Sequence, residues 1–178
     1  MGYLLEYANK PGLQPPSDVQ WPRNADLPRS GDRATLILAV HPQCPCTRAT
    51  LGELEIIMAR CFGKVAANVL LYRPGGSRPD WSDTDLKRTA LRIPGVTVVD
   101  DVDGREALSF GAATSGQTLL YDRSGRLVFK GGITASRGHA GDNNGRGAVI
   151  NLITTGTDRI SSTPVFGCSL RSAPSSWN

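Results

Sequence analysis

Two cysteines flank a single proline in residues 41–48, which read HPQCPCTR. Cys44 and Cys46 follow a compact apolar run and precede a segment with helical periodicity. A thiol at the start of a helix experiences the positive end of the helix dipole, which favours the thiolate form. Pro45 stiffens the turn and removes one backbone donor. These residue types in this place predict a pair of activated thiols suited to disulfide exchange.

Two other uses of the pair stay open. Two thiolates separated by one residue also suit a soft metal ion such as Cu(I), with His139, His41 or Cys168 completing the shell. Alternatively, Cys44 and Cys46 are buried structural thiols, although the polar character of the segment disfavours this. A disulfide between them would close a very small ring, and strained disulfides are easily reduced. The spacing therefore predicts an oxidising or isomerase-like couple.

The remaining cysteines need separate explanations. Cys61 falls on the apolar stripe of a predicted helix, which indicates a core position. Cys168 lies between glycine and proline residues outside any periodic element. It either joins the active pair as a third sulfur, forms a disulfide with Cys61, or is buried under the end of the chain.

Histidine and arginine residues offer partners for a thiolate. His41 precedes Cys44 by three residues, where it is placed to orient or deprotonate the thiol, or else to hydrogen-bond its own loop. Arg137 and His139 lie in a long polar loop over 133–147, and loops of that length are often functional. We expect Arg137 or His139 to stabilise a thiolate, unless the loop is simply held by its own turns.

The positioning elements follow from apolar periodicity. It predicts strands over 35–41, 65–72 and 96–100, helices over 47–62, 84–93 and 105–110, a hairpin over 117–130, and a last helix from Asn143 or Asn144 to Thr154. Ser82 or Asp83 is expected to cap the second helix, and Asp142 or Asn143 the last. Strands linked by helices form parallel crossovers, and the hairpin adds antiparallel strands. The expected fold class is therefore α/β, with a mixed sheet between helices.

This order of elements and motifs resembles the thioredoxin superfamily, in particular the membrane-tethered thiol–disulfide (TlpA-like) proteins of the bacterial envelope. CPCTRA aligns with their Cys-x-x-Cys-Arg-Ala motif, with Cys44 at the attacking cysteine and Thr47 at the resolving one. TSGQTLLYDRSGRLVF keeps the later Asp-x-x-Gly motif but has Gly116 where the family has a cis-proline. Together with GGITASRGHAGDNNG and TPVFGC, the pattern over roughly 34–170 looks most like the RedB-like branch.

The resemblance implies a thioredoxin-like sheet and protein thiols or disulfides as partners, with no cofactor. Because Thr47 replaces the second family cysteine, Cys46 or Cys168 is expected to resolve the mixed disulfide formed by Cys44. Loss of the cis-proline at Gly116 removes the backbone edge that holds substrate peptides in such enzymes, and leaves room for a different ligand.

Length, charge and motif content limit the number of domains and the classes of function that fit this sequence. The 178 residues suit one domain, expected over 34–170 between an extended segment 1–33 and a tail 171–178. The net charge of +4 is spread without any run of Lys or Arg longer than two, which argues against nucleic-acid binding. No dinucleotide, Walker or nucleophile-elbow motif occurs.

The chemistry also predicts a location. A strained Cys-x-Cys pair would be kept reduced in a cytosol, whereas an oxidising compartment lets it cycle. We therefore expect a periplasmic or extracytoplasmic protein, with the Pro- and Gly-rich stretch 10–33 as a spacer from a native signal or membrane helix. The full reading frame tests this expectation: an apolar segment encoded upstream of Met1 would support it, and its absence would leave it unsupported.

Overall fold

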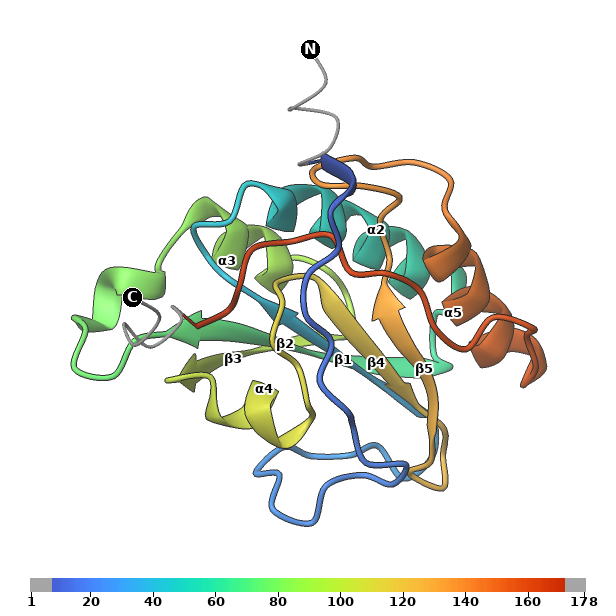
Figure 1. Cartoon of the computed structure of the whole chain (residues 1–178). Helices are drawn as coiled ribbons and strands as arrows, with labels where there is room; N and C mark the ends of the chain where they lie inside the picture. Colours follow the sequence, from blue (N-terminus) through green and yellow to red (C-terminus); the bar gives the residue numbers. More distant parts are fainter. Residues whose placement is uncertain (1–7, 172–178) are drawn as a thin grey trace.

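A five-stranded mixed sheet organises the computed structural model, which describes residues 8–171; the rest of the predicted end segments lies outside the described residues. The strand order is β3-β2-β1-β4-β5 (Figure 1). The strands are β1 (Ala34–Val40), β2 (Val65–Arg73), β3 (Val96–Val102), β4 (Gln117–Tyr121) and β5 (Leu127–Gly132). β1, β2 and β3 are parallel, whereas β4 runs antiparallel to both β1 and β5. The predicted mixed sheet is confirmed.

The central strand β1 is apolar on both faces because both faces are covered. Leu36, Leu38 and Val40 point into one core, and Ile37 and Ala39 point into the other. All five are at most 1% exposed. The prediction of a central buried strand over 35–41 is therefore correct within one residue at each end.

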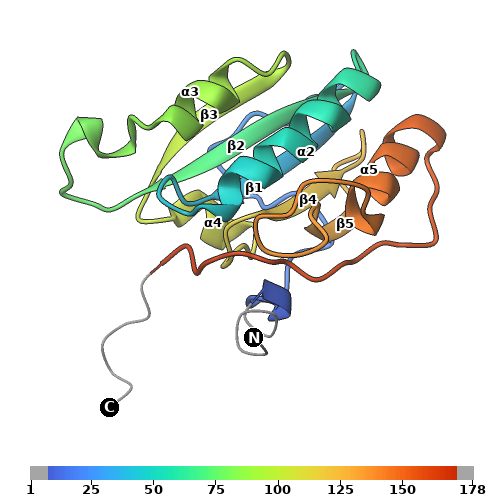
Figure 2. The ribbon, with the colours of Figure 1, turned by 90° about the horizontal axis from the view of Figure 1, so that it is seen from above.

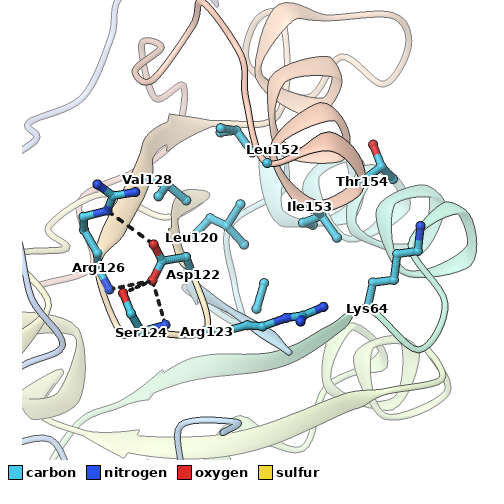
Figure 3. A pocket seen from close by; sticks show the side chains of 12 residues that line it. Lys64, Leu120, Asp122, Arg123, Ser124, Arg126, Val128, Leu152, Ile153 and Thr154 are labelled. Carbon is cyan, nitrogen blue, oxygen red and sulfur yellow. Dashed lines mark hydrogen bonds and ion pairs between the residues drawn. The ribbon is translucent and has the colours of Figure 1, made fainter. Parts of the chain in front are cut away.

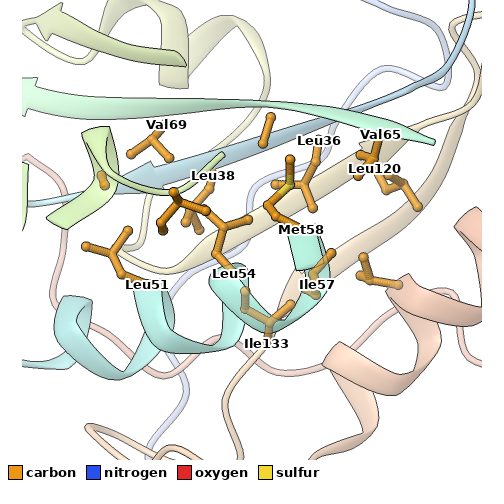
Figure 4. Close-up of a cluster of buried hydrophobic side chains, with 14 of the residues drawn as sticks. Leu36, Leu38, Leu51, Leu54, Ile57, Met58, Val65, Val69, Leu120 and Ile133 are labelled. Carbon is orange, nitrogen blue, oxygen red and sulfur yellow. The ribbon is translucent and has the colours of Figure 1, made fainter. Parts of the chain in front are cut away.

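Helices cover the two faces unequally. On one face lie α2 (Cys46–Arg60), α3 (Asp85–Leu91) and α5 (Asn144–Thr155); on the other lies the short α4 (Arg105–Ser109) with part of the N-terminal segment (Figures 1 and 2). None of the helices within residues 8–171 has the length and apolar character needed to span a bilayer. The larger core lies between α2 and the sheet (Figure 4), with these side chains at its centre: Leu36, Leu38, Leu51, Leu54, Ile57, Met58, Val69 and Leu120.

The cap of α3 differs from the prediction. Thr84 precedes the helix, and its Oγ1 accepts a hydrogen bond from the Lys87 N–H at 3.3 Å. Ser82 instead ends a short 3-10 helix, η1 (Pro79–Ser82), and donates to the Asp100 carboxylate at 2.9 Å. The capping assignment to Ser82 or Asp83 was wrong because that extra turn occupies both residues before α3 begins.

The segments at the two ends of the described chain lie beside each other. The N-terminal segment runs beside the segment that follows α5, and the Gly12 N–H donates to the Val165 carbonyl at 2.8 Å. Residues after α5 return along β5, where Lys130 and Ser162 form a parallel bridge. Figure 1 shows this returning segment in red, crossing the blue N-terminal segment on its way to the α4 side of the molecule.

A buried ion pair links α2 to α5 and to the loop before α5. The Glu53 side chain is 1% exposed, and its carboxylate accepts hydrogen bonds from the Arg146 guanidinium and from the Gly141 N–H, both at 2.6 Å. Arg146 also pairs with Asp142. Asn143 caps α5 by accepting from the Arg146 N–H at 2.8 Å, as predicted. These contacts fix the loop before α5 to the middle of α2.

Replacing Glu53 with glutamine tests this link. Glu53→Gln leaves the buried Arg146 without its main countercharge, and removing one partner of a buried pair is costly. We expect the free energy of unfolding to fall by roughly 3 kcal/mol, measured by urea denaturation. Glu55→Gln, at an exposed position of the same helix, is the matched control and should change little. Equal stability of both variants would contradict the assignment.

Candidate functional site

Cys44 lies in a tight turn between β1 and α2. Its N–H donates to the His41 carbonyl at 3.1 Å, and its own carbonyl accepts from the Thr47 N–H at 3.0 Å. Pro45 occupies the N-cap position of α2, and the helix has neither a side-chain cap nor an acidic residue in its first turn. The helix therefore offers unneutralised N–H groups to a nearby anion. Cys44 itself is only 2% exposed.

A distant part of the chain brings a second sulfur to Cys44. The Cys168 Sγ lies 3.2 Å from the Cys44 Sγ, within hydrogen-bond range. The Ser115 N–H, on the turn before β4, fixes the Cys168 backbone by donating to its carbonyl at 2.8 Å. Cys61 is fully buried in the core, and all four cysteines are free thiols. Of the three predicted places for Cys168, the structure shows the one beside the active pair.

The thiols differ in acidity. Burial alone would raise the pKa of Cys44, but hydrogen bonds from Cys168 and Cys46 outweigh it and lower that pKa below its usual value. The pKa of Cys168 is raised to about 11. Burial is the largest cause, and the hydrogen bond to Cys44 and the charge of Cys44 act in the same direction. Burial and the neighbouring Cys44 charge raise the pKa of Cys46. Of the three thiols, Cys44 is therefore the one whose thiolate form is favoured, whereas Cys46 and Cys168 favour the protonated form.

Arg137 is the cation of this site. Its positive charge opposes the rise in the pKa of both Cys46 and Cys168. The Arg137 N–H donates to the Ala8 carbonyl at 3.1 Å, which ties the loop to the N-terminal segment. His139, two residues on, is exposed, and its N–H donates to a carbonyl of the same loop at 3.3 Å. Of the two predicted loop residues, Arg137 thus lies at the thiols.

Thr47 and Gly116 occupy the positions where the resembling family has a cysteine and a cis-proline. The Thr47 hydroxyl donates to the His41 carbonyl at 3.0 Å and shares a hydrogen bond of 3.2 Å with Ser115 Oγ. Gly116 has φ of +95°, a region that favours glycine, and its N–H donates to the Ala39 carbonyl at 2.8 Å. Within residues 8–171 every peptide bond is trans. Thr47 therefore braces the turn and carries no thiol chemistry.

His41 holds its own loop. Its Nδ1 accepts from the Gln43 N–H at 3.2 Å, and burial lowers its pKa. The ring stacks on Tyr72, with centroids 5.4 Å apart, and meets Trp81 edge-on at 5.8 Å. The loop-bonding alternative is the one seen. Tyr72, Trp81 and Ser115 were not predicted from the sequence to lie near His41 and Thr47. The one signal in the sequence is the position of Ser115, directly before the hairpin.

Among residues 8–171, no group of three or more His, Cys, Asp or Glu side chains is placed to hold a metal ion. Cys44 and Cys46, with His139 as a further ligand, stay a prediction for Cu(I).

A cavity of about 510 Å³ lies at the opposite end of the sheet from the thiols (Figure 3). Its floor is apolar, formed by side chains such as Leu120, Val128 and Leu152, and its rim carries Lys64 and Arg123. No cysteine or histidine lines it. The cavity is therefore separate from the thiol site.

Two solved structures share the fold of this chain over nearly its whole length. No protein-family model and no curated protein matches the sequence. A hypothetical protein from Sinorhizobium meliloti 1021 is 19% identical with a TM-score of 0.66, over 93% of this chain and 96% of that chain. An uncharacterized conserved protein from Geobacillus kaustophilus is 19% identical with a TM-score of 0.62, over 95% and 96%.

A secreted Mycobacterium tuberculosis disulfide oxidoreductase, described as homologous to E. coli DsbE, is similar at 12% identity and a TM-score of 0.46, over 70% of this chain and 82% of that chain. The strand order and the placement of the helices are those of a thioredoxin-like fold, as predicted. Membership of the RedB-like branch stays a prediction.

The acidity of Cys44 can be tested through Cys168. Because hydrogen bonds from Cys168 help to lower the pKa of Cys44, Cys168→Ala should raise that pKa. We expect the pH at which alkylation of Cys44 by iodoacetamide is half-maximal to move upward, because only the thiolate reacts. Ser169 is the exposed residue next to Cys168, and Ser169→Ala is the control that should leave the pH profile of alkylation unchanged. An unshifted profile in Cys168→Ala would contradict the assigned hydrogen bonds.

Proposed function

We propose that this protein is a thiol–disulfide oxidoreductase in which Cys44 attacks a partner disulfide and Cys168 resolves the product. The observation that carries the proposal is the distance of 3.2 Å between the two sulfurs, at the start of a helix. The partners are protein thiols and disulfides.

Cys44 is suited to attack because it is the thiol whose thiolate form the site favours. Its lowered pKa increases the thiolate fraction at neutral pH, and the thiolate is the nucleophile in exchange. Its sulfur attacks one sulfur of the partner disulfide, forming a mixed disulfide and releasing the partner's other sulfur as a thiolate. That released thiolate takes up a proton from solvent.

Cys168 is suited to resolve because its sulfur already lies 3.2 Å from the Cys44 sulfur. Once Cys44 is bonded to the partner, its negative charge is gone, and so is one of the causes that raise the pKa of Cys168. The Cys168 thiolate then attacks the Cys44 sulfur and displaces the partner's second thiolate. The partner gains two electrons and two protons, and the protein retains a Cys44–Cys168 disulfide.

The direction of exchange follows from which state is stabilised. Interactions that lower the pKa of Cys44 stabilise the reduced protein, and a stabilised reduced form makes a couple more oxidising. We therefore expect an oxidising or isomerase-like couple, with a potential above the value of about −270 mV typical of thioredoxin. The steps above then run in reverse, and the Cys44–Cys168 disulfide oxidises partner thiols. Such a couple functions in a compartment that keeps disulfides oxidised, which supports the extracytoplasmic location. Membrane tethering stays a prediction.

Trapping the intermediate tests the assignment of roles. Reduced protein mixed with a large excess of oxidised insulin, which drives the exchange by mass action, should form a Cys44–Cys168 disulfide, identified by mass spectrometry of tryptic peptides. Cys168→Ser should accumulate a mixed disulfide between Cys44 and insulin, because the resolving sulfur is gone. Cys44→Ser should form neither product.

The same experiment separates the two candidate resolving residues. Cys46→Ser retains Cys168 and should resolve the intermediate as the unaltered chain does. If Cys46→Ser accumulates the mixed disulfide while Cys168→Ser turns over, Cys46 is the resolving cysteine and the assignment to Cys168 is wrong.

A further inference from the structure

The cavity at the end of the sheet opposite the thiols, here termed the hairpin cavity, has no part in the proposed exchange. The turn between β4 and β5 forms one wall, the last turn of α5 forms another, and Lys64, just before β2, lies on a third side (Figure 3). Its volume of about 510 Å³ lies within the range of roughly 300–1,000 Å³ that is typical of small-molecule sites. The hairpin cavity is therefore large enough for a small ligand.

The floor of the hairpin cavity is aliphatic. Leu120 is 1% exposed, whereas Val128, Leu152 and Ile153 pack against the same core but stay partly exposed. Helix α5 ends beside them, with Gly156 at φ of +82°. None of the described residues that line the cavity is aromatic. Such a floor favours a flexible alkyl chain over a flat ring, because a ring would find no aromatic partner to stack on.

The polar groups of the β4–β5 turn are already bonded to one another. The Asp122 carboxylate accepts from the Ser124 N–H at 2.9 Å and from the Arg126 N–H at 3.0 Å, and it pairs with the Arg126 side chain at 3.3 Å. The Ser124 hydroxyl donates to the same carboxylate at 2.6 Å. The Arg29 guanidinium donates to the Arg123 carbonyl at 2.5 Å. The turn is therefore preformed, and it leaves few groups free to pair with the backbone of a peptide.

Two cations at the rim carry charge that the protein does not use. The side chains of Lys64 and Arg123 are exposed, and within residues 8–171 neither of them forms an ion pair or a hydrogen bond. Figure 3 shows Arg123 extending across the mouth of the cavity toward Lys64. Because Arg126 already neutralises Asp122, the rim keeps an excess of positive charge. An anion fits this rim, and the planar guanidinium of Arg123 matches the geometry of a carboxylate.

We propose that the hairpin cavity binds a single-chain aliphatic carboxylate, with its alkyl chain on the apolar floor and its carboxylate at Arg123 and Lys64. An alcohol of the same length would gain the apolar contacts and leave both cations unmatched. An alkylammonium ion would be repelled by them. The site is independent of thiol–disulfide exchange, because it lies at the other end of the sheet from Cys44.

The two cations are not expected to contribute equally. Lys64 lies beside the last turn of α5, whose carbonyl groups carry partial negative charge and which has no basic residue of its own. Part of the Lys64 charge is therefore offset, whereas Arg123 extends from the β4–β5 turn. We expect Arg123 to be the stronger partner of the carboxylate.

Titration of ¹⁵N-labelled protein with octanoate, kept far below the concentration at which it forms micelles, tests the site. We expect saturable shifts of the amide signals of residues 122–126 and 152–156. In the series butanoate, hexanoate and octanoate, each added CH₂ should tighten binding about fourfold, because each buries more apolar surface. Octanol should bind about tenfold more weakly than octanoate. Octyltrimethylammonium should cause no saturable shift.

Charge variants test the rim. Arg123→Gln should weaken octanoate binding about fivefold and Lys64→Gln about twofold, because each removes one exposed charge. Arg105→Gln, at an exposed position of α4 on the other face of the sheet, is the matched control and should leave the affinity unchanged. The affinity for octanol should be the same in all three variants.

Filling the cavity tests the floor. Ile153→Trp places a bulky ring among the apolar side chains and should abolish octanoate binding. Ile56→Trp, at an exposed position of α2, is the matched control and should bind octanoate as the unaltered chain does. The amide spectrum shows whether each variant is folded. Thr154→Trp, at the exposed rim, obstructs the cavity without altering the core and should also weaken binding.

Three results would overturn the inference. Shifts confined to the amides around Cys44 and Arg137 would place the carboxylate at the thiols. Affinities that do not depend on alkyl length would show that the floor is not used. Equal binding of octanoate and octyltrimethylammonium would show that the rim charges are not used. The exchange function stands or fails separately, on the mixed disulfide with insulin.

Discussion

Stabilisation of a negative charge on a nearly inaccessible sulfur is the constraint on which the arrangement around Cys44 depends. A buried thiolate is unfavourable unless donors surround it. The start of α2 supplies unneutralised N–H groups on one side, and Cys168 supplies a donor on the other. The first source is built from adjacent residues, whereas the second comes from 124 residues away. The acidity of Cys44 thus depends on the contacts that hold Cys168 beside it.

Several buried polar contacts hold the end of the chain and the loop that carries Arg137. Gln117 shapes the turn before β4, which pairs with the segment bearing Cys168. Glu53 and Arg146 fasten the loop that carries Arg137 to the helix whose first turn contains Cys46. A buried polar network of this kind is expensive when incomplete but specifies a single arrangement when every member is paired. The thiols therefore lie among fixed dipoles and charges rather than in a generic apolar core.

Local patterns predicted the frame of the site well. Strand β1 and helix α2 follow from apolar periodicity, and the cap of α5 at Asn143 follows from residue type. The approach of Cys168 was left open, because no periodicity describes an extended segment whose position is set by pairing with a distant turn. The cap of α3 at Thr84 was missed since a short 3-10 helix uses the preceding residues, and aromatic neighbours such as Trp81 come from a loop without a pattern.

The contact between the Gly12 N–H and the Val165 carbonyl has a consequence for how the molecule is made. It joins residue 12 to residue 165, so it forms only after nearly the whole described chain has been made. Synthesis proceeds from the N-terminus, and pairings between distant residues form late because their loop-closure entropy is large. Cys44 therefore leaves the ribosome well before the segment that covers it. During that interval its sulfur is accessible to cellular thiol-modifying enzymes and oxidants, from which the finished protein shields it.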